Sequence, residues 1–170
     1  MDTFDGFFAE KDKMFKAMKD SRVGSFGVQS IIIITLLQLA SFIKINNQII
    51  NVLPICLFWG RFSTLIYIDR FKYIAHKNKS ISHKKYWRGF RKESTYSILF
   101  LILLIFYYFF SANSQQNLIH NILLISAGLF SSITVPFFLG RKFGGFTGDT
   151  CGACVVINET IILFIYGIFL

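Results

Sequence analysis

The sequence predicts an all-α protein: a polytopic membrane helix bundle with about five transmembrane helices. Of its 170 residues, 54% are hydrophobic and only 16% are charged, which is too little charge to cover the surface of a soluble domain of this length. The apolar residues, among them 21 phenylalanines, collect in long runs, and the charges collect between the runs. This pattern indicates a protein whose main solvent is lipid.

Five apolar stretches approach the ~20 residues that a helix needs to cross a hydrocarbon core of ~30 Å. They cover about residues 23–43, 49–68, 95–112, 118–139 and 153–170. Each is expected to be helical, because a backbone with unpaired polar groups is not tolerated against lipid. We treat residues 1–170 as a single membrane domain.

The basic residues fall in alternate connections between these stretches. The N-terminal segment 1–22 holds five Lys/Arg, the connection 69–93 holds nine, and the Gly-rich loop 140–152 begins with two more. The opposite connections, 44–48 and 113–117, hold one and none. The positive-inside rule therefore places segments 1–22, 69–93 and 140–152 in the cytoplasm. The net charge of +9 follows from this topology, and nucleic-acid binding is not expected.

The three cysteines indicate neither a disulfide framework nor a metal site. Their number is odd, and residues 1–22 lack the apolar core of a secretory signal. Cys151 and Cys154 form a C-x-x-C pair, but no second ligand pair accompanies it. We expect both to be packing residues.

Acidic and hydroxyl side chains near the N-terminus could serve a phosphate chemistry. Asp2 and Asp5 are three residues apart, so on a helix they lie on one side of a turn and can share a divalent cation. The run Met-Lys-Asp-Ser-Arg-Val-Gly-Ser-Phe-Gly at 18–27 adds Asp20, Ser21 and Arg22 at the entrance to the first span. Its two glycines expose backbone or let a neighbouring helix approach closely.

The Gly-rich loop has the composition of a phosphate-binding segment. It reads Gly-Arg-Lys-Phe-Gly-Gly-Phe-Thr-Gly-Asp-Thr from residue 140 and is expected to be a flexible loop that opens the last span. Free N–H groups at that helix start, together with Arg141 and Lys142, suit a phosphate. Asp149 suits the metal that would accompany the phosphate.

Two charged residues lie within the predicted spans. Charges at such depths are costly and tend to face a cavity or a partner. Arg61, in the second span, is a candidate contact for a substrate phosphate. Glu159, in the last span, lies about 15 Å along a helix from Asp149, too far to share one ion, and could instead bond Asn or Ser on another span.

The three motifs, in this order and at these intervals, resemble the cobalamin synthase family. That family is adenosylcobinamide-GDP ribazoletransferase, a Mg²⁺-dependent enzyme of the bacterial inner membrane. The resemblance implies that adenosylcobinamide-GDP and α-ribazole, or its 5′-phosphate, are joined with release of GMP. It also implies a multi-pass location in the inner membrane with cytoplasmic active-site loops, in contact with lipid. Whether the chain forms a homo-oligomer or associates with other membrane proteins is left open.

The resemblance assigns roles to named positions. The implied Mg²⁺ ligands are Asp2, Asp5, Asp149 and, as the weaker candidate, Asp20. The implied substrate-binding residues are Ser21, Arg22, Arg61, Arg141, Lys142, Gly144, Gly145, Thr147 and Gly148. The identity of a general base is left open.

The N-terminus departs from the family pattern. Family members are longer there and carry a His/Asp-Gly-Leu-Ala stretch before the first acidic motif. The chain is therefore expected to lack part of the acidic site and at least one span, and its activity by itself is left open.

Parts of the sequence also allow two other functions. Asp2-x-x-Asp5-Gly6-x-x-Ala9 also resembles the start of the CDP-alcohol phosphotransferase signature, but Glu10 stands where that signature has Arg, and its later Asp-x-x-x-Asp run is missing. A permease or accessory subunit would predict an internal repeat, and none is evident.

Overall fold

The structure is a computed structural model that describes residues 1–74, 86–110 and 115–169. The helices are α1 (Asp2–Phe8), α2 (Met14–Ala17), α3 (Ser25–Ile45), the 3-10 helix η1 (Asn46–Gln48), α4 (Ile49–Arg70), α5 (Phe90–Phe110), α6 (Gln115–Phe143) and α7 (Gly148–Phe169). No strand forms among the described residues, where a single isolated backbone bridge joins Tyr73 to Phe146. The predicted all-α class is confirmed.

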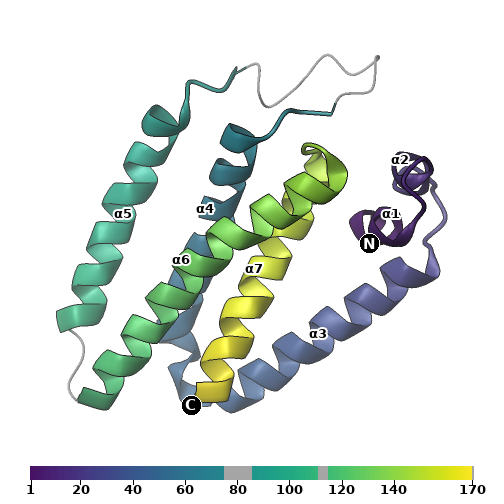
Figure 1. The fold of residues 1–170 in the computed structure, drawn as a ribbon. Coiled ribbons are helices and arrows are strands. Elements are labelled where there is room, and N and C mark those ends of the chain that lie inside the picture. The colour runs from purple at the N-terminus through teal and green to yellow at the C-terminus, as the bar shows by residue number, and fades with distance from the viewer. Residues whose placement is uncertain (75–85, 111–114, 170) are drawn as a thin grey trace.

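Each of the five predicted spans corresponds to one long helix, from α3 to α7. By length and apolarity the described chain contains four continuous segments that could cross a membrane, because α3, η1 and α4 form one segment, Ser25–Arg70. The chain reverses direction within that segment at η1 (Figure 1). There Asn46 has a φ of 44°, a positive value that asparagine adopts more often than most residues. The segment is therefore a helical hairpin with two spans.

The helix ends that carry the predicted cytoplasmic motifs gather at one end of the bundle. Figure 1 shows α1 and α2, the C-terminal end of α4, the N-terminal end of α5 and the α6–α7 turn at that end, with η1 and the C-terminus opposite. Four lysines of the basic connection, Lys77, Lys79, Lys84 and Lys85, lie outside the described residues. The shared end is thus confirmed, whereas its cytoplasmic location stays a prediction.

Helices α4, α6 and α7 form the packed centre of the bundle, α3 rests on α7, and α5 lies along α4 (Figure 1). One core cluster fills the half near η1 and includes Trp59, Ile55 and Ile162. A second cluster lies near the motif-bearing end, where Met14 and Met18 of the N-terminal segment join Phe146. The N-terminal segment is therefore anchored in the same core as the α6–α7 turn.

Close packing of α4 on α6 depends on a glycine. A Cβ added to Gly128 would lie 2.0 Å from Cδ1 of Trp59. We expect Gly128→Ala to lower the free energy of unfolding by about 1–3 kcal/mol, because the indole must leave its place. The matched control is Gly152→Ala, where an added methyl group meets open space and should raise stability by about 0.5–1 kcal/mol. Thermal unfolding in detergent followed by circular dichroism measures both, and equal effects would contradict the packing role.

Candidate functional site

Two of the predicted metal ligands, from opposite ends of the sequence, line the same cleft. Asp2 on α1 and Asp149 on α7 border a cleft of about 540 Å³ that also touches α3. Thr35 and Gln38 of α3 add a hydroxyl and an amide to its lining. Both aspartates are exposed. Carboxylates, hydroxyls and amides offer the hard oxygen atoms that Mg²⁺ and Ca²⁺ prefer, so the donor set fits a divalent cation.

The start of α7 is fixed by a reciprocal pair of threonines. The backbone N–H of Thr147 donates to Oγ1 of Thr150 at 2.8 Å, and the N–H of Thr150 donates to Oγ1 of Thr147 at 3.2 Å. Thr147 therefore acts as the N-cap, as in a capping box. Asp149 then occupies the first turn of α7, where the helix dipole favours a negative charge.

Asp5 does not line this cleft. Its Oδ2 accepts a hydrogen bond from the backbone N–H of Gly24 at 3.0 Å, and its Oδ1 accepts one from Gly27 at 2.8 Å. These are the N-cap and the third residue of α3. Both carboxylate oxygens are thus engaged by the start of another helix, an arrangement that residue spacing within α1 could not indicate. The predicted sharing of one cation by Asp2 and Asp5 stays a prediction.

Asp20, Ser21 and Arg22 are exposed on the connection between α2 and α3. The Arg22 side chain donates to both carboxylate oxygens of Asp20, at 3.2 and 3.1 Å. These side-chain bonds, with a further bond from the backbone N–H of Arg22, hold the pKa of the Asp20 carboxyl below its usual value. The side-chain bonds and the negative charge of Asp20 in turn raise the pKa of Arg22. Neither residue lines the cleft, so the structure separates this pair from Asp2 and Asp149.

The predicted flexible loop at 140–152 is wrong in extent and in character. α6 continues to Phe143 and α7 begins at Gly148, so only residues 144–147 connect them. The N–H of Phe146 donates to the carbonyl of Lys72, and the carbonyl of Phe146 accepts from Ile74, both at 2.9 Å. The turn is therefore clamped to the chain that follows α4.

Two glycines of this turn are required by its backbone conformation and its packing. Gly144 has a φ of 73°, which favours glycine. A Cβ on Gly145 would lie 2.4 Å from the carbonyl oxygen of Lys72. The N–H groups of Phe146, Thr147 and Thr150 donate to partners within the protein, so they are not free for a phosphate. Substrate contacts by Gly144, Gly145, Thr147 and Gly148 stay a prediction.

A buried tyrosine reinforces the clamp. The Tyr67 hydroxyl donates to the carbonyl of Gly145 at 3.0 Å. We expect Tyr67→Phe to lower the free energy of unfolding by about 1–3 kcal/mol, because a buried carbonyl loses its donor. The control is Tyr96→Phe on α5, whose side chain is exposed. Urea titration in detergent measures both variants; equal stability of Tyr67→Phe and wild type would show that the clamp does not need this bond.

Arg141 and Lys142 occupy the last turn of α6 rather than a loop. Both line a second cleft beside Thr134 and Phe138. The Nζ of Lys142 lies 4.7 Å from the ring centre of Phe7, a cation–π contact with α1. Lys142 therefore borders the same short helix that carries Asp2.

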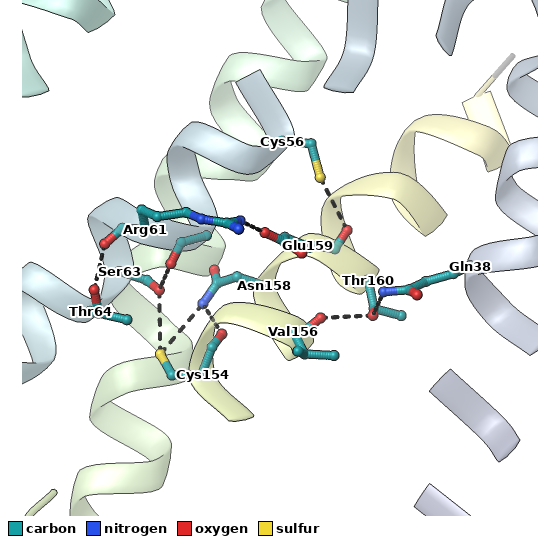
Figure 2. A network of polar contacts seen from close by, with 11 residues as sticks. Gln38, Cys56, Arg61, Ser63, Thr64, Cys154, Val156, Asn158, Glu159 and Thr160 are labelled. Atoms are coloured by element: carbon teal, nitrogen blue, oxygen red, sulfur yellow. Dashed lines mark hydrogen bonds and ion pairs between the residues drawn. The ribbon is translucent and has the colours of Figure 1, made fainter. Parts of the chain in front are cut away.

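Arg61 forms an ion pair with Glu159, and this pair joins α4 to α7 (Figure 2). Arg61 lies nine residues before the end of α4 at Arg70, or roughly 14 Å along the helix. Glu159 thus has an arginine as its partner, not Asn or Ser. The structure does not bring Arg61 to the cleft of Asp2, since it borders a separate one between α4 and α5.

Cys154 belongs to the core cluster near the α6–α7 turn and Cys151 packs against that cluster, as predicted for both. Cys154 is buried on α7, and its Sγ lies 3.4 Å from Oγ of Ser63 on α4 (Figure 2). The Sγ of Cys56 donates to the backbone carbonyl of Glu159 at 3.4 Å. All three cysteines are free thiols. In the part of the chain that the structure describes, no three His, Cys, Asp or Glu side chains gather closely enough to hold a metal by themselves.

Three polar residues of α3 line the cleft, Ser30, Thr35 and Gln38, and the sequence analysis predicted none of them as site residues. A signal for Thr35 and Gln38 was present, because two polar side chains three residues apart in the apolar stretch 31–40 lie on one face of a helix. Gln38 also donates to Oγ1 of Thr160 at 3.0 Å, which ties α3 to α7 (Figure 2). This bond holds the two walls of the cleft together.

Comparison with known proteins gives a consistent result. The family model described as cobalamin-5-phosphate synthase matches residues 1–167. Two proteins from different strains of Prochlorococcus marinus, both named adenosylcobinamide-GDP ribazoletransferase, are 40% identical over 174 residues and 32% identical over 172 residues. A Clostridium kluyveri protein of the same name is 32% identical over 173 residues.

These matches cover unequal shares of the chains. The Prochlorococcus alignments cover 100% of this chain but 66% of each relative, and the Clostridium alignment covers 94% and 62%. No solved structure matches the chain significantly. The family match extends over nearly the whole sequence and includes all three motifs, so the chain belongs to the cobalamin-5-phosphate synthase family.

Proposed function

We propose that this chain carries the membrane-embedded catalytic region of an adenosylcobinamide-GDP ribazoletransferase. The observation that carries the proposal is the meeting of Asp2 and Asp149 in one cleft at the motif-bearing end of the bundle. The family match and the names of the relatives support the substrates, adenosylcobinamide-GDP and α-ribazole or its 5′-phosphate. The alternation of basic connections supports a cytoplasmic location for this end, and we propose that the protein lies in the inner membrane.

The reaction is a substitution at phosphorus. A ribose hydroxyl of α-ribazole forms a bond to the phosphorus attached to cobinamide, the bond to the bridging oxygen breaks, and GMP leaves with that oxygen. The hydroxyl proton passes to solvent or to a base. Such reactions depend mainly on positioning and on neutralising charge.

The residues of the cleft have corresponding roles. Asp2 and Asp149 would hold Mg²⁺, which supplies charge neutralisation at the diphosphate when bound. Proteins often bind this ion through one or two carboxylates and complete its coordination with water and substrate phosphates, so a pair suffices. Arg141 and Lys142 would attract the diphosphate from the adjacent end of α6.

The proposal is tested with the chain in lipid vesicles and with a version extended by any in-frame sequence upstream of Met1. Both receive adenosylcobinamide-GDP, α-ribazole and Mg²⁺, and GMP and cobalamin are measured by chromatography. We expect product from the extended version, and its loss with EDTA. Absence of both products from both versions would overturn the proposal, and product that persists in EDTA would overturn the Mg²⁺ assignment.

A further inference from the structure

We propose that Asp5 is a positioning residue: its carboxylate fastens α1 to the start of α3, and this keeps Asp2 in the cleft that Asp149 also lines. The inference rests on the proposed function only in taking Asp2 and Asp149 as the metal-binding pair. Asp5 itself is assigned no contact with metal or substrate. Its role is to connect two helices through their backbone and so shape the cleft.

The contacts of Asp5 are those of a helix cap supplied from another helix. Gly24 has φ −77° and ψ 164°, the extended conformation of an N-cap residue, and as a glycine it has no side chain to cap α3 itself. Asp5 caps the helix instead, because its carboxylate accepts hydrogen bonds from the N–H groups of Gly24 and Gly27. A negative charge at this helix start is favourable as well.

The two glycines of α3 are fitted to this carboxylate. A Cβ on Gly24 would lie 2.2 Å from Oδ1 of Asp5, and a Cβ on Gly27 would lie 2.4 Å from Oδ2. Any side chain at either position would displace the carboxylate. Asp5 of the acidic motif and the glycines of the Gly-Ser-Phe-Gly motif therefore form one contact between α1 and α3, which we call the α1–α3 joint.

A second contact fixes the other side of the joint. A Cβ on Gly6 would lie 2.4 Å from Cγ of Met18, and Met18 is buried in the core cluster near the α6–α7 turn. α1 is therefore held against α3 by Asp5 and against α2 by its neighbour Gly6. This attachment decides where the first residue of α1, Asp2, lies.

Two variants separate positioning from metal ligation and from simple stability. Gly27→Ala keeps every carboxylate but displaces that of Asp5. Asp5→Ala/Gly24→Ser gives α3 a local cap, since serine at an N-cap can accept from the third residue of the helix, but leaves α1 unfastened. The matched control in the same turn is Ser25→Ala, an exposed position.

The affinity for Mn²⁺, a spectroscopic substitute for Mg²⁺, is measured in vesicles by electron paramagnetic resonance. Hydrogen–deuterium exchange of residues 23–28 reports the α3 cap, and thermal unfolding reports the fold. We expect both variants to lose Mn²⁺ affinity by roughly 10–100-fold, as supporting residues around a metal site do. The double variant is expected to retain slow exchange, and Ser25→Ala to bind Mn²⁺ like wild type.

Three results would overturn the inference. Wild-type Mn²⁺ affinity in Gly27→Ala would mean that the joint does not position Asp2. Wild-type Mn²⁺ affinity in Asp5→Ala/Gly24→Ser would mean that Asp5 only caps α3. Fast exchange of residues 23–28 in the wild type would mean that Asp5 does not protect these amides. The last readout needs no metal, so it distinguishes failure of the joint from failure of the proposed function.

Discussion

Asp149→Asn is expected to reduce Mn²⁺ affinity and cobalamin formation by at least roughly 100-fold, a loss typical when one preorganised charge-stabilising group is removed from an active site. Asparagine has the same shape but lacks the charge that a divalent cation requires. The position is exposed in the first turn of α7, so the fold should be retained. Binding isotherms and product assays at several Mg²⁺ concentrations give the two values.

The paired variant for this prediction is Asp2→Asn, which should have a similar effect because both residues line one cleft. The control is Asp12→Asn, an exposed acid of the N-terminal segment that does not line the cleft. Should Asp149→Asn match Asp12→Asn in Mn²⁺ affinity, the metal-binding assignment of Asp149 would be wrong.

Arg61→Leu is expected to destabilise the protein by about 1–3 kcal/mol, because the Glu159 carboxylate, only 16% exposed, is left without its ion-pair partner. Glu159→Gln should also destabilise it, since the arginine charge then loses its partner. Arg61→Leu/Glu159→Leu should be more stable than either single variant, because it removes both charges and leaves neither without a partner. Thermal unfolding in detergent completes the double-mutant cycle.

The same double variant tests the predicted contact between Arg61 and a substrate phosphate. If Arg61 only pairs with Glu159, the stable double variant should retain substrate affinity. If the double variant is stable but has a raised KM for adenosylcobinamide-GDP, the predicted contact between Arg61 and the substrate would be supported. Additive losses of stability in the cycle would contradict a direct interaction between the two charges.

Much of the fold was readable from hydrophobicity. The spans at 23–43 and 49–68 match α3 and α4 closely, because a lipid-exposed backbone has no stable alternative to a helix. The spacing of basic residues also predicted which ends lie together. The loop at 140–152 was predicted too long, because glycine weakens a helix without preventing it where packing supports it, as at Gly140 against the ring of Phe71.

The candidate site was predictable in part. Motif residues indicated Asp2, Asp5 and Asp149 together, yet only Asp2 and Asp149 share a cleft. Asp5 has the same chemistry and lies in the same motif, but its oxygens bond to α3. Spacing along one helix cannot reveal a hydrogen-bond partner that lies on another.

The sequence by itself determined the helical class, the alternation of basic connections and the family, because each depends on residue type and order along the chain. The tertiary structure decided the role of each charge. It brought Asp149 to Asp2, gave Arg61 the partner Glu159, and engaged Asp5 at the start of α3. The physical reason is that a charge in or near a membrane must find its compensating partner in space, and helix packing sets which partners are within reach.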